Sequence, residues 1–193
     1  MILITGGAGF IGSNLVAALS KKAGVPKITV VDRLGIDDKW KNLTNHLVHQ
    51  IIEPEQLDRY LSENDGAMEY VFHLGAISST TEKDVDLILR NNFNLSLKLW
   101  KWCTNHQIPF IYASSAATYG NGKNGFNDNF DPKELSKLKP LNPYGWSKHL
   151  FDKLVNYDVL NGYAYPPQWA GLKFFNVFGP NEIHKGAQSS FIA

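Results

Sequence analysis

The sequence predicts an α/β fold in which a doubly wound parallel sheet carries helices on both faces. Short, continuously apolar runs alternate with longer amphipathic ones along the 193 residues. That alternation is typical of strand–helix–strand units whose strands are buried on both sides. The first apolar run leads into a glycine-rich turn that opens a helix, and the second run ends in an aspartate. These features together predict a Rossmann-type architecture.

Composition and charge exclude several classes of protein. The 19 basic and 18 acidic side chains give a net charge of +1, without the basic stripe that nucleic-acid binding needs. No apolar run is long enough for a membrane helix, and no basic amphipathic helix suggests a membrane surface. The single cysteine, Cys103, excludes a disulfide scaffold and is expected in the core. Without a charged leader or cleavage site, we expect a cytoplasmic protein.

The first half of the chain supplies three strands and two helices. Residues 2–5 form an apolar run, and 10–22 follow as an amphipathic helix. Residues 28–32 are rich in β-branched side chains and predict a second strand, with a weaker third over 46–52. Residues 54–63 are predicted to be helical because Pro54 suits the first turn of a helix.

The second half repeats the alternation. Residues 70–73 predict the fourth strand, 109–114 the fifth and 171–176 the sixth. Residues 82–106 carry apolar side chains at helical spacing and predict one long helix, and 144–160 predict another.

The remaining segments bear on function and domain organisation. Residues 119–143 are rich in Asn, Gly, Asp, Lys and Pro and predict a long surface loop with a functional role. We expect residues 1–176 to form the nucleotide-binding domain. Residues 177–193 then begin a substrate-binding region that is truncated in this chain.

The glycine-rich turn predicts a dinucleotide site. Gly6, Gly9 and Gly12 lie between the first strand and the first helix, where missing Cβ atoms let a pyrophosphate approach the backbone. Phe10 and Ile11 open the helix, whose amide groups favour an anion. Asp32 follows Gly12 by about 20 residues, the position from which a carboxylate reaches the adenosine ribose.

The choice of cofactor is open on these residues alone. Asp32 by itself favours NAD, because its carboxylate suits a free ribose 2′-hydroxyl. Arg33 and Lys39 are cations that could hold the 2′-phosphate of NADP. Both could equally be solvated loop residues. No metal site is expected.

A second group of residues predicts hydride-transfer chemistry. Tyr144 and Lys148 are four residues apart at the start of a predicted helix, so they share one face. A nearby ammonium group favours the phenolate and makes the tyrosine a better acid–base group. Ser115 ends the fifth strand, where ligands of parallel sheets bind, and Thr118 is a second candidate to hold the reacting oxygen.

Further motifs resemble those of the extended short-chain dehydrogenase/reductase family of nucleotide-sugar enzymes, and within it the epimerases that act on ADP-heptose. The resemblance spans the whole chain. It is carried by His-Leu-Gly-Ala-Ile-Ser-Ser-Thr-Thr-Glu at 73–82, by residues 112–120, by Phe-Phe-Asn-Val-Phe-Gly-Pro at 174–180 and by His-Lys-Gly at 184–186. The chain departs from the pattern at Arg33, Pro54 and Asn181, among others.

The resemblance implies roles for particular residues. Tyr144 and Lys185 would be the two acid–base groups, with NADP kept bound through turnover. The residues lining the cofactor would be Phe10, Ile11, Asp32, Arg33, Lys39, Leu74, Gly75, Ala76, Ile77, Ser78, Asn91, Tyr144 and Lys148. Those touching the sugar nucleotide would be Ser79, Ser115, Asn176, Val177 and Lys185.

The implied reaction is epimerisation at C6 of an ADP-heptose for lipopolysaccharide core biosynthesis, in a homo-oligomeric enzyme. One alternative is another nucleotide-sugar 4-epimerase or 4,6-dehydratase. Dehydration is disfavoured because Ala116-Ala117-Thr118 lacks a carboxylate. The other alternative is a dinucleotide-binding module without catalysis. Retention of Ser115 and Tyr144 argues against it.

Overall fold

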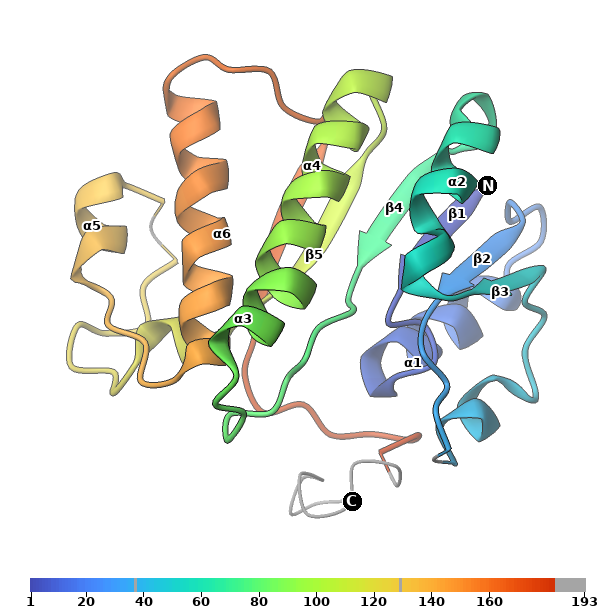
Figure 1. The fold of residues 1–193 in the computed structure, drawn as a ribbon, viewed down its shortest axis with the longest axis horizontal. Coiled ribbons are helices and arrows are strands. Elements are labelled where there is room, and N and C mark those ends of the chain that lie inside the picture. Colours follow the sequence, from blue (N-terminus) through green and yellow to red (C-terminus); the bar gives the residue numbers. More distant parts are fainter. Residues whose placement is uncertain (37, 129, 183–193) are drawn as a thin grey trace. The chain divides into compact units, whose positions relative to one another are not determined.

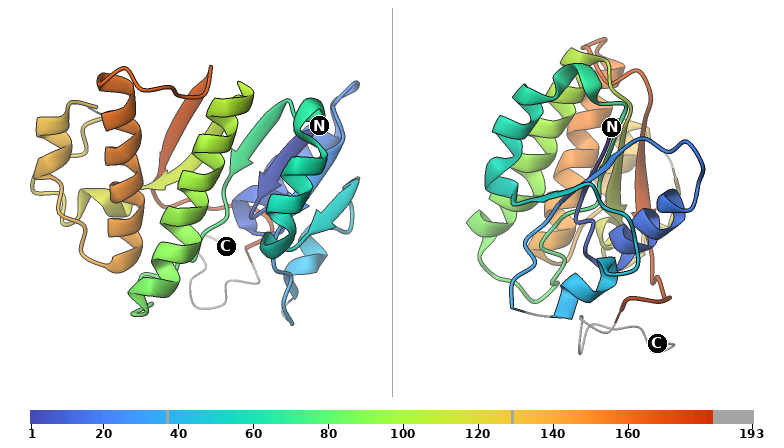
Figure 2. Two further views of the ribbon diagram at one scale, coloured as in Figure 1. Left: turned by 45° about the horizontal axis from the view of Figure 1, so that its top comes forward. Right: turned by 90° about the vertical axis from the view of Figure 1, so that its right-hand side faces the viewer.

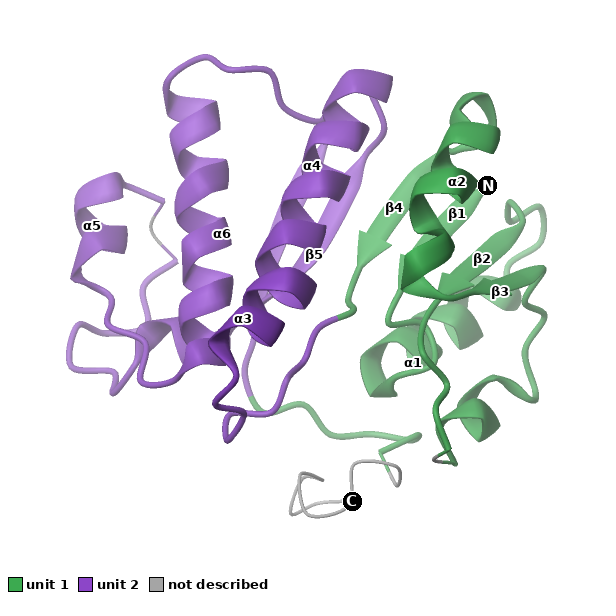
Figure 3. Ribbon diagram, viewed as in Figure 1, with its two compact units in different colours: residues 1–75, 176–193 green, residues 76–175 purple. Residues whose placement is uncertain are grey.

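The computed structural model describes residues 1–36, 38–128 and 130–182. The chain forms two compact units, drawn in green and purple in Figure 3. Unit 1 comprises residues 1–75 together with the segment from residue 176, and unit 2 comprises residues 76–175. Both units combine helices with parallel strands, as the alternating apolar pattern predicts.

Unit 1 contains a four-stranded parallel sheet in the order β3-β2-β1-β4. Its strands are β1 (Ile2–Thr5), β2 (Ile28–Val31), β3 (Gln50–Ile52) and β4 (Tyr70–His73). In the register, Thr5 is the partner of both Val31 and His73. The carboxyl ends of three strands are therefore level, and the loops that follow them leave from one edge of the sheet.

Helices α1 (Phe10–Ser20) and α2 (Leu57–Glu63) cover opposite faces of this sheet (Figure 2, right). The alternation of side chains along a strand explains how both faces are filled. Ile4 and Val30 pack with Val16 of α1 in one buried cluster. On α2, Leu57 and Tyr60 are buried, and the Tyr60 hydroxyl lies 2.7 Å from that of Thr29. Helices on both faces were predicted, and unit 1 has them.

The described part of unit 1 also contains the 3-10 helices η1 (Asp38–Leu43), η2 (Pro54–Gln56) and η3 (Asp65–Ala67). Pro54 lies in the first turn, as predicted, and a reciprocal capping box between Glu53 and Gln56 fixes the start.

Unit 2 is built on the parallel strands β5 (Phe110–Ser115) and β6 (Trp169–Phe174). Helices α4 (Leu95–His106) and α6 (Pro143–Leu160) lie on the same face of this pair (Figure 1). Trp100 of α4 packs edge-on against Phe110, Phe151 and Trp169, with ring centroids 5.8–6.3 Å apart. Cys103 is fully buried beside it, which confirms its predicted place in the core.

The long helix predicted over 82–106 is interrupted. It consists of α3 (Val85–Ile88), a π-helical segment η4 (Leu89–Asn94) and α4. It begins three residues later than predicted because the Asp84 carboxylate accepts from the Leu87 amide and caps the first turn. The apolar spacing is nearly the same for α and π turns over so short a stretch, so the sequence pattern did not reveal the insertion.

The predicted loop 119–143 also contains structure. Helix α5 (Pro132–Lys137) lies within it, begun by Asp131, whose side chain accepts from the Lys133 amide. The 3-10 helix η5 (Ala116–Tyr119) precedes it. Strand β6 lies two residues earlier than predicted, because Trp169 pairs with Phe110. Among the described residues, no helix has both the length and the apolar character needed to cross a membrane.

Candidate active site

The glycine turn of unit 1 is compact enough to require glycine. Gly6 has a φ of +68°, and its amide donates to the Val31 carbonyl at 2.8 Å. A Cβ on Gly12 would lie 2.1 Å from the Gly6 oxygen, and one on Gly6 would lie 2.6 Å from the Gly75 nitrogen. The start of α1 therefore packs directly on the turn, and larger residues at these positions would push the two apart.

The amino terminus of α1 fits a pyrophosphate. Gly9 is the N-cap residue, and no side chain caps the helix there. Phe10 is buried and Ile11 half-buried at the first turn. Since helix N-termini present amide donors and a partial positive charge, an anion is the complementary ligand. The residues predicted to hold the pyrophosphate are thus brought together.

Asp32 is held by two groups beside the glycine turn. One carboxylate oxygen accepts from the Ala8 amide at 2.9 Å, and the other lies 2.6 Å from Lys39 Nζ. Arg33 points elsewhere and pairs with Glu55, with both side chains exposed. Arg33 holds the pKa of Glu55 below its usual value. Of the two predicted cations, Lys39 is therefore the one next to Asp32.

The segment after β4 is fixed by residues that sequence reasoning missed. In unit 1, the Thr5 hydroxyl lies 2.6 Å from His73 Nδ1 and accepts from the Gly75 amide at 3.0 Å. Leu74 donates its amide to the Thr5 carbonyl. The available signal was a threonine and a histidine that end neighbouring apolar strands.

The continuation of this segment belongs to unit 2. The buried Asn92 side chain accepts from the Ile77 amide at 2.8 Å and donates to the Ile77 carbonyl at 3.0 Å. It therefore holds the backbone between Ala76 and Ser78 from the π-helical segment. The neighbouring Asn91, which is predicted to line the cofactor, donates to the Leu87 carbonyl of its own helix.

Ser115, Tyr144 and Lys148 come together in unit 2. Ser115 ends β5, and its hydroxyl accepts from the Ala117 amide at 3.1 Å. Tyr144 hydrogen-bonds to Ser115. Lys148 lies one turn further along α6 and is almost completely buried.

Local sequence fixes the start of α6. The Asn142 side chain accepts from the Gly145 amide at 2.8 Å, and Pro143 occupies the first turn. A Cβ on Gly145 would lie 2.7 Å from the Ala117 oxygen. Glycine after Tyr144 therefore lets the helix approach the turn that carries Ser115.

The electrostatics of this set follow from burial. Burial raises the pKa of Tyr144, and the hydrogen bond from Ser115 opposes that rise. Burial lowers the pKa of Lys148 to about 8, against the attraction of Asp152. Lys148 is therefore largely charged at neutral pH, and a positive charge close to a tyrosine favours its phenolate.

The remaining predicted residues are less constrained. The Ser79 hydroxyl lies 2.9 Å from that of Thr81. Asn176 is exposed and Val177 half-buried just after β6. Lys185, predicted as the second acid–base group, lies outside the described residues.

Within unit 1, the end of the described chain contacts the first turns of α1, and Asn42 contacts the glycine turn. Asn181 donates to the Ser13 hydroxyl at 3.0 Å, and Asn14 donates to the Pro180 carbonyl at 2.9 Å. Asn42 donates to the Ala8 carbonyl at 2.9 Å. None of these asparagines was predicted to bear on the site, because the contacts join residues more than 30 positions apart.

Comparison with known proteins identifies relatives over the whole chain. The sequence model of the NAD dependent epimerase/dehydratase family matches residues 2–193. An ADP-L-glycero-D-manno-heptose-6-epimerase from Fusobacterium nucleatum subsp. nucleatum is 46% identical over 194 residues, covering 100% of this chain and 57% of the relative. The chain thus spans little more than half the length of that relative.

Solved structures of epimerases are also similar to this chain. The Helicobacter pylori ADP-L-glycero-D-manno-heptose-6-epimerase matches 99% of this chain and 60% of its own, with a TM-score of 0.77 and 32% identity. The UDP-glucuronic acid 4-epimerase from Bacillus cereus, solved in complex with NAD, matches 95% of this chain and 60% of its own, with a TM-score of 0.76 and 27% identity. These likenesses confirm the predicted Rossmann-type fold.

Proposed function

Because this chain belongs to the NAD dependent epimerase/dehydratase family, we propose that it is part of an enzyme that inverts C6 of ADP-D-glycero-β-D-manno-heptose. The observation that carries the proposal is the hydrogen-bonded Tyr144 and Ser115 with the buried Lys148 one turn away. The substrate is taken from the 46% identical relative, whose name states a heptose 6-epimerase. The product would serve lipopolysaccharide core biosynthesis.

In the proposed reaction, each residue of the catalytic set has a separate role. The glycine turn and the first turn of α1 would hold a nicotinamide dinucleotide, which would supply reversible hydride exchange with C6 of the sugar. Ser115 hydrogen-bonds the reacting oxygen, while Tyr144 takes the hydroxyl proton. Lys148 stabilises the phenolate form of Tyr144 through its charge. Lys185 is proposed to protonate the oxygen after the hydride returns. Hydride and proton are both restored, so no net oxidation occurs.

The proposal also includes the domain boundaries, the residues that contact the substrate and the oligomeric state. Residues 1–176 are proposed as the nucleotide-binding domain, and 177–193 as the beginning of the substrate-binding region. Asn176, Val177 and Ser79 are proposed to touch the sugar nucleotide. A homo-oligomer is proposed for the enzyme.

NADP is the proposed form of the cofactor. Lys39 lies 2.6 Å from Asp32, where it can meet a 2′-phosphate and offset the repulsion between that phosphate and the carboxylate. Arg33 is held by Glu55, which competes with the phosphate for the guanidinium group. Lys39 thus favours the phosphorylated cofactor, whereas the ion pair with Glu55 reduces the contribution of Arg33.

Replacing Lys39 with alanine is expected to weaken NADPH binding by about tenfold, because one charge-assisted contact is lost. NADH binding is expected to change by less than about threefold. Glu55→Gln is expected to tighten NADPH binding severalfold by releasing Arg33. Fluorescence titration with each dinucleotide measures both effects, with Lys41→Ala as a surface control, since Lys41 pairs with Asp38. Equal losses for NADH and NADPH in Lys39→Ala would contradict the assignment.

The function itself is tested by proton NMR of ADP-D-glycero-β-D-manno-heptose incubated with the protein and no added cofactor. The assay is run on the 193-residue chain and on a longer protein that contains it. Conversion to the L-glycero epimer by the longer protein is expected, with retained cofactor. We expect the 193-residue chain to bind dinucleotide but turn over poorly. No conversion by the longer protein would redirect the proposal to another nucleotide sugar.

A further inference from the structure

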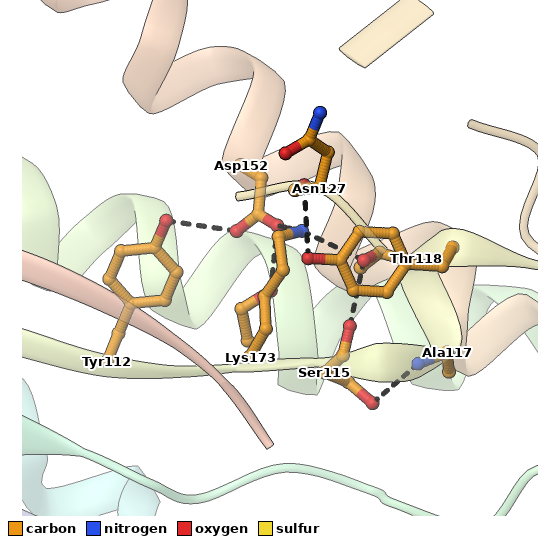
Figure 4. A network of polar contacts seen from close by, with 9 residues as sticks. Tyr112, Ser115, Ala117, Thr118, Asn127, Asp152 and Lys173 are labelled. Carbon is orange, nitrogen blue, oxygen red and sulfur yellow. Dashed lines mark hydrogen bonds and ion pairs between the residues drawn. The ribbon is translucent and has the colours of Figure 1, made fainter. Parts of the chain in front are cut away.

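A buried ion pair lies beside Ser115 and Lys148 in unit 2. Lys173 of β6 is 2.7 Å from the Asp152 carboxylate of α6, and their side chains are only 16% and 3% exposed. Asp152 also accepts from the Tyr112 hydroxyl at 2.9 Å and from the Ser114 hydroxyl at 2.7 Å. Figure 4 shows this network from close by. Burying two charges is costly, so the pair is a weak source of stability and calls for another explanation.

Lys173 extends the network to the catalytic serine. Its ammonium group also donates to the Thr118 hydroxyl at 2.8 Å, which in turn donates to the Ser115 carbonyl at 2.8 Å (Figure 4). The Ser115 hydroxyl accepts from Ala117, within the same turn. The turn that carries Ser115 is therefore fastened from the neighbouring strand through one lysine.

Asp152 extends the network to the catalytic lysine. It lies four residues after Lys148 on α6, so both side chains share one face of the helix. Asp152 favours the charged form of Lys148 against the effect of burial. Asp152 is therefore the charged group that opposes the effect of burial on Lys148.

The other titratable groups around α6 do not replace the effect of the Asp152 carboxylate on Lys148. Burial raises the pKa of Tyr112 and Tyr119 and lowers that of His149, so all three favour their neutral forms near neutral pH. Tyr144 is also neutral in the chain alone, since burial raises its pKa. The charged residues of the helices packed against α6 lie at the surface: Asp86, Arg90, Lys133, Glu134 and Lys137.

We propose that Lys173 and Asp152 act together as a positioning dyad for the catalytic set. Lys173 holds the Ser115 turn through Thr118, and Asp152 keeps Lys148 charged while Lys173 limits that effect by neutralising the carboxylate. The inference rests on the proposed function in one respect: Ser115 and Lys148 must carry the hydride-transfer chemistry. Neither member of the dyad is itself expected to touch the substrate.

The dyad predicts opposite effects on Lys148 from removing its two members. Asp152→Asn removes a negative charge and is expected to lower the titration midpoint of Lys148 by about 1 pH unit. Lys173→Met removes a positive charge and is expected to raise the midpoint. Ser114→Ala is the matched control, since it removes one hydrogen bond to Asp152 without changing any charge. NMR of lysine labelled at the ε-carbon, assigned with Lys148→Arg, measures each midpoint.

Turnover of the full enzyme supplies the second readout. Lys173→Met is expected to lower kcat by about 10- to 100-fold with little change in KM, because Ser115 is displaced but substrate contacts remain. Lys173→Arg is expected to restore most of the rate, since it keeps the charge and the donor. The fall of kcat at alkaline pH is expected to follow the Lys148 midpoint in each variant.

The outcomes separate this inference from the proposed function. Midpoints that move in the same direction in Asp152→Asn and Lys173→Met, or that do not move, would overturn the dyad even if ADP-heptose is epimerised. If Asp152→Asn does not fold, the test rests on two results: the rise of the Lys148 midpoint in Lys173→Met and the recovery of kcat in Lys173→Arg. An enzyme inactive on ADP-heptose would still report the midpoints, and the function alone would fail.

Discussion

Tyr144→Phe is expected to lower kcat by at least about 10³-fold, because the substrate hydroxyl loses its proton acceptor. The ring remains, so the packing of α6 against the Ser115 turn is retained. Only the hydrogen bond between Tyr144 and Ser115 is lost, which is expected to change the free energy of unfolding by about 1 kcal/mol. Turnover is measured by the NMR assay, and dinucleotide binding by fluorescence titration.

The matched control is Tyr157→Phe, which removes a tyrosine hydroxyl from the exposed side of the same helix. It is expected to turn over normally. Dinucleotide binding by Tyr144→Phe is expected to stay within about threefold of the unmodified protein, since the glycine turn that would hold the pyrophosphate lies in unit 1. Undiminished turnover by Tyr144→Phe would remove Tyr144 from the mechanism.

The parts of the fold that depend on local pattern were predicted closely. Strands β1 and β4 have the predicted bounds, because each is a short, largely apolar run, which ends at Gly6 in β1 and begins after Glu69 in β4. Helix α5 was missed because six residues are too short for an apolar period to be recognised among polar neighbours. Its signal was Asp131 followed by Pro132, an N-cap and a first-turn proline.

In the candidate site too, the residues that depend on local sequence were predicted, and those that depend on strand pairing were not. The glycines, Tyr144 and Lys148 were predicted because their spacing along the chain fixes their geometry on a turn or a helix. The partners that hold them were not. Lys173 meets Asp152 only because β6 pairs with β5. A charged residue inside an otherwise apolar strand was the available signal, since such a residue requires a partner.

Asp152 itself could have been predicted from α6. It follows Lys148 by four residues, which places a carboxylate one turn from the lysine. What the sequence could not indicate is the extent of its burial, with three donors from β5 and β6 around it. Burial determines how strongly the carboxylate acts on Lys148, because charges interact more strongly away from water.

Lys148→Met is expected to abolish turnover and to stabilise the protein by about 2 kcal/mol at pH 7. Burial lowers the pKa of Lys148 from 10.5 to about 8, so the folded protein binds the Lys148 proton less tightly than the unfolded chain does. At pH 7 Lys148 still carries this proton, and the buried charge destabilises the folded state. Methionine fills similar space without a charge, and Asp152 keeps its pairing with Lys173. A gain in stability at the expense of activity is expected where a buried charge serves catalysis.

The stability gained by Lys148→Met is expected to depend on pH. Below about pH 8 both states hold the Lys148 proton and the cost of burying the charge is complete, so the gain from Lys148→Met is largest. Between about pH 8 and pH 10.5 the unfolded chain binds more protons than the folded one, so the unmodified protein gains stability as pH rises. The difference between the two proteins therefore closes over that window. Urea denaturation across the pH range measures it, with exposed Lys153→Met on the same helix as the control. A difference that stays constant with pH would mean that repacking, rather than removal of a buried charge, stabilises the variant.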